Sequence, residues 1–309
     1  MPSTDLPAAS SSPAPATRPA APSIVTPSGQ ASPERSRPTL GVALITLDAA
    51  AHLAACLAAV SFADRIVIVD GGSRDDTLAI AARHGAEIHP RPDWAGFGIQ
   101  KNRAVELLDT DWILVVDADE VVTPALAASI RDVVATDRAG VHALDRLSSF
   151  CGHWVRHSGW RPDAVPRLFK RGAARFSEDR VHERLVFSGP AHVLEGLLLH
   201  YSYDDIGAVL RKLDSYSGAG ARQRFERGAG AGFGKAVWRG IWAFLRTYFL
   251  RLGCLDGRAG FMIAVFNAET VYYRFLRLAE LTQGARARAT SAEAEHAPAE
   301  RGAPRPGRD

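Results

Sequence analysis

The sequence has 309 residues, 47% of them hydrophobic and 23% charged, with a net charge of +3. These proportions are those of a globular protein with a buried core, and they exclude a collagen-like or wholly disordered chain. Its three cysteines, Cys56, Cys151 and Cys254, are far apart, which argues against a disulfide framework or a Cys-x-x-Cys zinc site. Since Met1 is not followed by a basic segment and then an apolar one, we expect no secretory signal and a cytoplasmic chain.

Both ends of the chain differ from the rest in composition. Residues 1–38 are nearly all Pro, Ala, Ser and Thr, and residues 284–309 are mainly Ala, Arg, Glu, Gly and Pro. Such segments bury too little apolar surface to offset the entropy lost on ordering. We therefore predict two disordered tails around an ordered region formed by residues 39–283.

Strands and helices are predicted to alternate in the first half of the chain. Apolar runs at residues 41–47, 65–70, 86–89 and 111–116 predict strands, and residues 50–60, 73–83 and 97–108 predict helices. Ser73 and Asp76 have the spacing of a capping box, and Thr123 followed by Pro124 predicts the start of a further helix. Repeated βα units predict an α/β fold with a mostly parallel sheet.

The most informative segment is the apolar run 112–116 followed by Asp117-Ala118-Asp119. Residues i and i+2 of an extended chain point the same way, so Asp117 and Asp119 can converge on one hard cation. Asp70 also follows a strand, and the carboxyl ends of parallel strands form the ligand crevice of open α/β sheets. The sequence therefore predicts a site for a metal and a phosphate-bearing ligand at this edge. An Asp-x-Asp pair is also typical of a solvated turn, which is the alternative.

Other nucleotide and phosphate sites can be compared with this pattern. A Gly-x-Gly-x-x-Gly after the first strand is absent, and so is a P-loop motif. Asp117 to Val121 does fit the Asp-x-Asp-x-[Thr/Val] motif of haloacid-dehalogenase-type phosphohydrolases, with Asp117 as nucleophile. That motif normally lies on the first strand of its domain, whereas three βα units precede it here, so this reaction is kept as an alternative.

Taken together, the motifs resemble those of the family 2 glycosyltransferases of GT-A fold. The general match consists of Thr46-Leu47-Asp48, Val69 to Thr77 and Asp117-Ala118-Asp119, within residues 39–135. A narrower resemblance, to lipopolysaccharide core glycosyltransferases of the β-1,4-glucosyltransferase type, is carried by the following segments: Phe97-Gly98-Ile99-Gln100-Lys101-Asn102, Trp154 to Trp160, Arg167-Leu168-Phe169, Val181-His182-Glu183, His200-Tyr201-Ser202 and Phe261 to Tyr273. The chain departs from the family at Asp48-Ala49, where Asn-Glu is common.

This resemblance implies a domain plan and a reaction. Residues 39–205 would form the GT-A catalytic domain, with a nucleotide half at 39–135 and an acceptor half at 136–205, and residues 206–283 a helical extension. The reaction would be a metal-dependent, inverting transfer of a sugar, glucose, from a UDP-linked donor to a lipopolysaccharide core or related glycolipid.

Roles for single side chains follow from the resemblance. Asp119 would hold Mg²⁺ or Mn²⁺ on the diphosphate, Asp117 would contact the ribose or the metal, and His200 would complete the metal shell as a neutral imidazole. His200 closes an apolar run, which is equally typical of a core histidine bonded to a backbone carbonyl. The nucleotide-sugar contacts would be Thr46, Asp48, Asp70, Gln100, Asn102, Asp117, Trp160 and Arg167.

An inverting transfer also needs a general base, which typically contributes 10² to 10⁴ in rate. Glu183 is the preferred base, Asp179 and Glu178 are its rivals, and Glu183 could instead pair with Arg180 or Arg184. Arg167 would clamp the diphosphate and Trp160 would stack on a sugar face, or either could serve the fold.

Residues 211–280 combine basic and aromatic side chains. This segment holds twelve Lys or Arg against five acids, a local balance of +7. The mixture suits the headgroup region of an anionic membrane, and the apolar stretch 259–268 is shorter than the ~20 residues of a transmembrane helix. We therefore predict that the protein lies peripherally on the cytoplasmic face of the inner membrane. There are two alternatives: the helices pack only on the catalytic core, or the chain is a non-catalytic membrane scaffold. Nucleic acid is not expected as a partner, because no recognition motif is visible.

Overall fold

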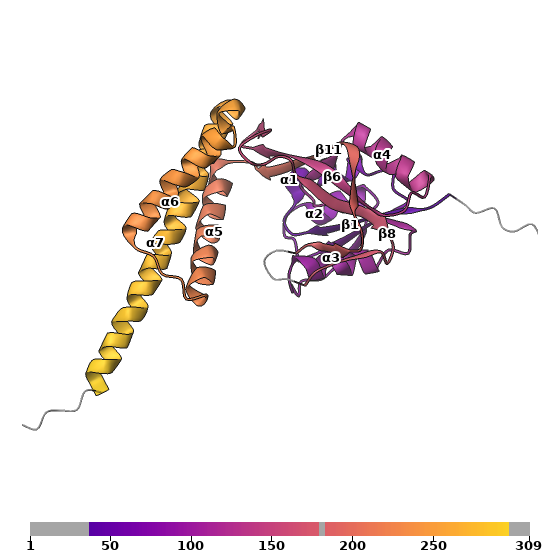
Figure 1. The fold of residues 1–309 in the computed structure, drawn as a ribbon. Helices are drawn as coiled ribbons and strands as arrows, with labels where there is room; N and C mark the ends of the chain where they lie inside the picture. The colour runs from indigo at the N-terminus through magenta and orange to yellow at the C-terminus, as the bar shows by residue number, and fades with distance from the viewer. Residues whose placement is uncertain (1–36, 179–182, 297–309) are drawn as a thin grey trace, which may run out of the picture. The chain divides into compact units, whose positions relative to one another are not determined.

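The computed structural model describes residues 37–178 and 183–296 (Figure 1). Its main sheet has the strand order β3-β2-β1-β4-β8-β6-β11-β5, with β7 paired to β6, and β9 and β10 form a separate two-stranded sheet. The strands of the first half are β1 (Leu40–Thr46), β2 (Arg65–Asp70), β3 (Glu87–Pro90), β4 (Trp112–Val115) and β5 (Glu120–Val122). Those of the second half are β6 (Val141–Phe150), β7 (His153–Trp154), β8 (Ala164–Lys170), β9 (Ala174–Phe176), β10 (Leu185–Phe187) and β11 (Ala191–Tyr203).

The sheet is parallel in its first half and mixed in its second. Strands β3, β2, β1 and β4 run parallel, as the repeated βα units predicted. Strand β8 joins β4 and β6 in antiparallel pairs, and β11 is parallel to β6 but antiparallel to β5. The fold is therefore the predicted α/β fold of GT-A type, with antiparallel strands added to the parallel half.

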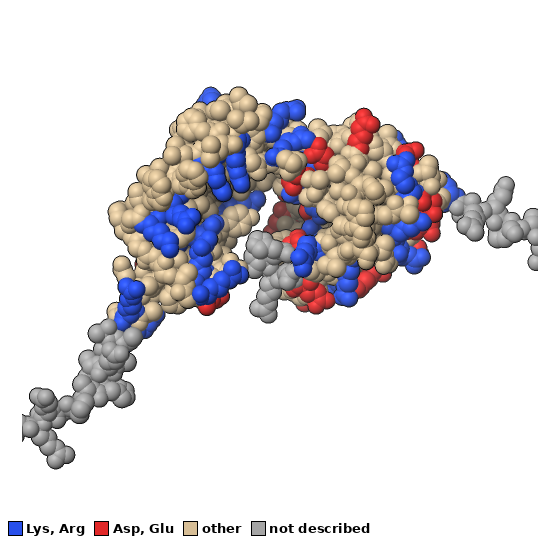
Figure 2. All heavy atoms as spheres, viewed as in Figure 1, with Lys and Arg blue, Asp and Glu red and all other residues tan. Residues whose placement is uncertain are grey.

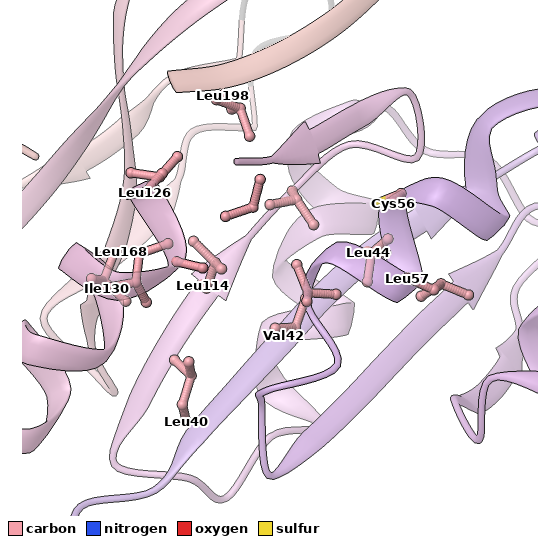
Figure 3. Packing of buried hydrophobic residues seen from close by; sticks show 14 of the residues in the cluster. Leu40, Val42, Leu44, Cys56, Leu57, Leu114, Leu126, Ile130, Leu168 and Leu198 are labelled. Atoms are coloured by element: carbon pink, nitrogen blue, oxygen red, sulfur yellow. The ribbon is translucent and has the colours of Figure 1, made fainter. Parts of the chain in front are cut away.

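Four helices cover the two faces of this sheet: α1 (Ala50–Ala59), α2 (Thr77–Arg83), α3 (Phe97–Glu106) and α4 (Pro124–Ala135). Alternate residues of β1 point to opposite faces, so Val42 and Leu44 pack in the core under α1, α2 and α4, whereas Ala43 packs in the core under α3. Figure 3 shows the first of these cores, in which α1 and α4 bring Leu57 and Ile130 to the sheet. Because both faces are buried, the strands are continuous apolar runs.

The helix starts show one confirmed and one wrong prediction. Thr123 accepts a hydrogen bond from the backbone N–H of Leu126, and Pro124 is the first residue of α4, as expected. The predicted capping box of Ser73 and Asp76 is wrong, because α2 begins only at Thr77. The Ser73 hydroxyl instead donates a hydrogen bond to Asp70. This local bond stabilises the turn after β2 and leaves Ser73 outside the helix.

Residues after β11 form a helical segment of α5 (Ile206–Glu226), α6 (Phe233–Leu245), the π-helical turn η1 (Arg246–Leu250), the 3₁₀ turn η2 (Gly253–Asp256) and α7 (Gly257–His296). Helix α7 packs along both α5 and α6 (Figure 1). It continues beyond residue 283, where the sequence predicted a disordered tail, because the Ala, Arg and Glu of this stretch are strong helix formers. Within the described ranges, no helix is both long and apolar enough to cross a membrane.

Candidate functional site

The turn that follows β2 is hydrogen-bonded to the end of β1, which borders the site. Thr46 and Ser73 donate side-chain hydrogen bonds to Oδ1 of Asp70, and the backbone N–H groups of Gly72 and Ser73 donate to Oδ2 at 2.8 and 2.9 Å. Burial alone would raise the pKa of Asp70, but these hydrogen bonds outweigh it and the pKa is lowered. Asp70 is therefore an ionised carboxylate that stabilises the turn by accepting these hydrogen bonds.

A cavity of about 760 Å³, called the main cavity here, opens at the carboxyl ends of β1 and β4. Thr46 and Asp48 line it from the end of β1, Asp117 and Asp119 from the end of β4, and His200 from β11. Glu183 and several aromatic side chains, among them Trp94, Phe97, Tyr201 and Tyr216, complete the lining. The crevice predicted from the strand ends is present, and it contains most of the expected acidic residues.

Asp119 and His200 are brought together by strand pairing. The Asp-x-Asp turn leads into β5, and the antiparallel register places Glu120 opposite His200, so that the Tyr201 N–H donates to the Asp119 carbonyl at 2.9 Å. His200 Nε2 lies 3.5 Å from Asp119 Oδ2, and His200 Nδ1 lies 2.9 Å from the Ser148 hydroxyl. If Nδ1 carries the proton and donates to Ser148, the lone pair of Nε2 points to the Asp119 side.

This pair fits a divalent metal bound together with a diphosphate. The Asp119 side chain is 41% exposed, and its carboxylate is a ligand that suits Mn²⁺ or Mg²⁺. In the described part of the chain no three Asp, Glu, His or Cys side chains gather into a metal site. A metal held by Asp119 and His200 would take its remaining ligands from phosphate oxygens and water.

Asp117 lies in a buried network of charges. Its Oδ1 is 2.9 Å from Lys101 Nζ and its Oδ2 is 2.6 Å from Arg167 Nη2, while Arg167 also contacts Glu120 at 3.1 Å. Although burial would raise the pKa of Asp117, the charges of Arg167 and Lys101 lower it strongly. Each oxygen thus already has a cation, so this arrangement does not support the predicted binding of a metal by Asp117.

Lys101, to which the sequence analysis gave no role, lies in the same network and lines the main cavity. Its side chain is 5% exposed, and Nζ bridges Asp117 and Glu183, with 3.1 Å to Glu183 Oε1. Glu183 itself is 22% exposed and faces the main cavity. Gly98, one helical turn before Lys101, permits this contact, because a Cβ there would lie 1.9 Å from the Ser177 carbonyl oxygen.

Comparisons with known proteins agree with this geometry. The sequence profile of the family described as Glycosyl transferase family 2 matches residues 42–186, which include the strands of the parallel half and the Asp-x-Asp turn. The chain contains a family 2 glycosyltransferase domain. The phosphohydrolase and scaffold alternatives are not supported by this match.

Two relatives extend the similarity beyond the family domain. This glycosyltransferase is 28% identical to an uncharacterized glycosyltransferase of Rickettsia prowazekii over 251 residues, which are 77% of this chain and 85% of the relative. It is 29% identical to the lipopolysaccharide core biosynthesis glycosyltransferase LpsC of Rhizobium meliloti over 251 residues, 79% of this chain and 92% of LpsC. Among solved structures, glucosyl-3-phosphoglycerate synthase from Mycobacterium tuberculosis, in complex with Mn²⁺, UDP and glucosyl-3-phosphoglycerate, is 21% identical with a TM-score of 0.31, over 36% of this chain and 44% of that one.

Several residues predicted to bind the nucleotide sugar have structural partners in the glycosyltransferase instead. The Asn102 amide donates to the Phe176 carbonyl and accepts from the Phe176 N–H, both at 2.9 Å, and the Gln100 amide donates to the Arg91 carbonyl. Both side chains therefore tie α3 to its neighbours. Like Asp70, neither of them lines the main cavity.

Arg167 and Trp160 do not line the main cavity either. Arg167 is buried beneath the Asp-x-Asp turn between Asp117 and Glu120, so it cannot clamp a diphosphate without breaking those ion pairs. Trp160 packs against Phe150 and lines a different cavity. Asp179, the rival base, lies outside the described residues, and Glu178 pairs with Arg175 at 3.0 Å on the surface.

Proposed function

We propose that the protein catalyses the metal-dependent, inverting transfer of a hexose, glucose, from a UDP-linked donor to a lipopolysaccharide core or related glycolipid. The observation that carries this proposal is that Glu183 and the Asp119–His200 pair line one cavity at the carboxyl end of the parallel strands. The name of the relative LpsC supports the choice of acceptor. Glucose and UDP come from the resemblance in the sequence motifs.

The reaction assigns a task to each group. A metal held by Asp119 and His200 would neutralise the charge that develops on the diphosphate. Glu183 would take the proton of the acceptor hydroxyl while the hydroxyl oxygen forms the bond to the anomeric carbon. The electron pair of the breaking C–O bond leaves with the nucleoside diphosphate. Lys101 fixes the Glu183 carboxylate by its ion pair, and Thr46 and Asp48 lie where the nucleotide would enter.

The first test is a turnover assay with extracted lipid A–core. We expect the protein to release UDP from UDP-glucose in the presence of Mn²⁺. Release of UDP from UDP-galactose, or of GDP from GDP-mannose, should be slower or absent. Because UDP-glucose is α-linked, an inverting enzyme must form a β-linked product, which the anomeric proton coupling reports in NMR. EDTA should stop the reaction. An α-linked product would contradict inversion, and release of inorganic phosphate with inhibition by beryllium fluoride would indicate a phosphohydrolase.

We further propose that the helical segment holds the enzyme on the cytoplasmic face of the inner membrane. A continuous stretch of α6, η1 and η2 exposes large apolar side chains, named the apolar face here: Phe233, Trp238, Ile241, Trp242, Leu245, Phe249, Leu250, Leu252 and Leu255. Figure 2 shows Lys and Arg gathered over the helical segment, with few acidic side chains among them in this view. Apolar side chains bordered by basic ones suit the headgroup region of an anionic bilayer.

Removing two tryptophans from the apolar face should weaken this attachment. Trp238 and Trp242 are 64% and 43% exposed, so Trp238→Ser with Trp242→Ser should leave the fold intact while removing apolar area that would enter the lipid. Sedimentation with phosphatidylglycerol-containing liposomes should show at least a tenfold weaker affinity, and high salt should weaken the wild type. Val193→Ser, an exposed apolar residue of β11, is the matched control. Equal sedimentation of the double variant and the wild type would exclude the apolar face as the membrane contact.

A further inference from the structure

A second cavity, of about 490 Å³ and called the side cavity here, lies where β6 and β11 meet α5 and α7. Its lining includes Arg146, Trp160, Tyr216, Asn267 and Arg274. It shares His200, Ser202 and Tyr216 with the main cavity. The two cavities therefore adjoin beside the Asp119–His200 pair, and a ligand in one can reach the other.

Residues that line the side cavity belong to an apolar cluster between the sheet and helices α5 and α7. Phe150 and Tyr203 of the sheet form one apolar cluster with Leu213 of α5 and Ile263 and Phe266 of α7. The Tyr203 and Phe266 rings meet edge to face at 5.7 Å. This cluster joins the sheet to both helices, and the loop between β7 and β8 adds Gly159, Trp160, Pro162 and Asp163 to the lining of the side cavity.

Arg274 differs from two other arginines, Arg146 of the side-cavity lining and Arg167, which is buried beneath the Asp-x-Asp turn. Arg146 pairs with Asp163 and Glu120, and Arg167 pairs with Asp117 and Glu120. Arg274, by contrast, makes no ion pair with any described residue, and its buried Nε has no hydrogen-bond partner there. Desolvation and the nearby charge of Arg224 both lower its pKa. A guanidinium without its counter-charge costs free energy, which an anionic ligand would recover.

The neighbouring helix is built to accommodate this arginine. Gly220 of α5 faces Arg274, and a Cβ at that position would lie 2.6 Å from Arg274 Nε. Any other residue there would displace the guanidinium. The side cavity thus has an arginine without an ion-pair partner among the described residues on one wall and an indole, Trp160, among its other lining residues.

We propose that the side cavity binds an anionic substituent, a phosphate or a carboxylate, of the saccharide acceptor, with Arg274 as its counter-ion. This rests on the proposed function, since it names the class of acceptor for that reaction. A guanidinium recognises either anion through paired N–H donors, and the Trp160 ring offers an apolar surface to the sugar. Because the cavities adjoin at His200, an acceptor anchored in the side cavity can extend a hydroxyl into the main cavity, where Glu183 lies.

The test uses glucose 6-phosphate, glucuronate and glucose as probes, with Mn²⁺ and saturating UDP present to occupy the donor site. Calorimetry on the full-length protein should detect millimolar binding of both anionic sugars and at least tenfold weaker binding of glucose. Arg274→Met, which keeps the aliphatic stem, should abolish this preference, and Arg274→Lys should restore part of it. Arg222→Met, an exposed arginine on α5 that does not line the cavity, is the matched control.

The outcomes separate this proposal from the proposed function. If Arg274→Met retains the wild-type preference for anionic sugars, or if the wild type binds glucose as tightly as the anions, the assignment of Arg274 is wrong. Selectivity for glucose 6-phosphate over glucuronate would identify phosphate as the anion, and the reverse would identify a carboxylate. UDP binding that does not depend on metal would instead contradict the proposed function. Thermal unfolding of each variant shows whether a loss of binding comes from a loss of fold.

Discussion

Glu183→Gln should lower kcat by at least a hundredfold while the affinity for UDP stays within about twofold of wild type. The amide keeps the shape of the side chain and can still lie beside Lys101, but it cannot accept the proton of the acceptor hydroxyl. Because the base acts only in the transition state, its removal should affect kcat more than KM. Steady-state kinetics with the lipid acceptor, together with calorimetric titration of UDP and Mn²⁺, measure the two effects separately.

Two further substitutions make this test specific. Glu178→Gln removes a carboxylate from the same segment whose surface pair with Arg175 has no link to the main cavity, so its kcat should match the wild type. Asp179→Asn tests the rival base. A Glu183→Gln enzyme with near wild-type kcat, beside an inactive Asp179→Asn enzyme, would show that the proton acceptor had been misassigned.

The parallel half of the sheet was predictable because its signals are local. Strands buried on both faces require unbroken apolar runs such as 65–70, and each helix between them shows its apolar residues at helical spacing. The position of Asp119 followed from the same logic, since a strand that ends at residue 115 delivers it to the carboxyl edge. The antiparallel insertion of β8 between β4 and β6 has no such local signal, because it depends on pairing between distant segments.

The partners of the polar side chains were the part that the sequence could not provide. Arg167 reaches Asp117 across fifty positions, and Lys101 reaches Glu183 across eighty-two. A motif shows that Gln100, Lys101 and Asn102 occur together, but only the rotation of α3 decides which of them faces the cavity. Here Lys101 does, and its two neighbours bond to backbone groups.

Asp119→Ala should abolish transfer and raise the Kd for UDP in the presence of Mn²⁺ by at least about tenfold, a loss of about 1.4 kcal/mol. The carboxylate is the charged protein group next to His200, so its removal leaves a bound metal with one neutral protein ligand. Without metal the variant and the wild type should bind UDP equally, because Asp119 would then have no favourable contact with the diphosphate. Calorimetric titrations of UDP with Mn²⁺ and with EDTA measure this difference between the two conditions.

The size of that difference, rather than the loss of activity, decides whether Asp119 binds the metal. A variant that merely disturbs the turn would weaken UDP binding equally with Mn²⁺ and with EDTA, whereas loss of a ligand affects only the titration with Mn²⁺. Asp132→Ala, which removes an exposed carboxylate of α4 paired with Arg138, should change neither titration. His200→Ala should weaken metal-dependent binding less than Asp119→Ala, since it removes a ligand without charge. If UDP binds to Asp119→Ala and to the wild type with equal affinity in Mn²⁺, the metal lies elsewhere in the cavity. The contact between Asp119 and His200 would then only stabilise the pairing of β5 with β11.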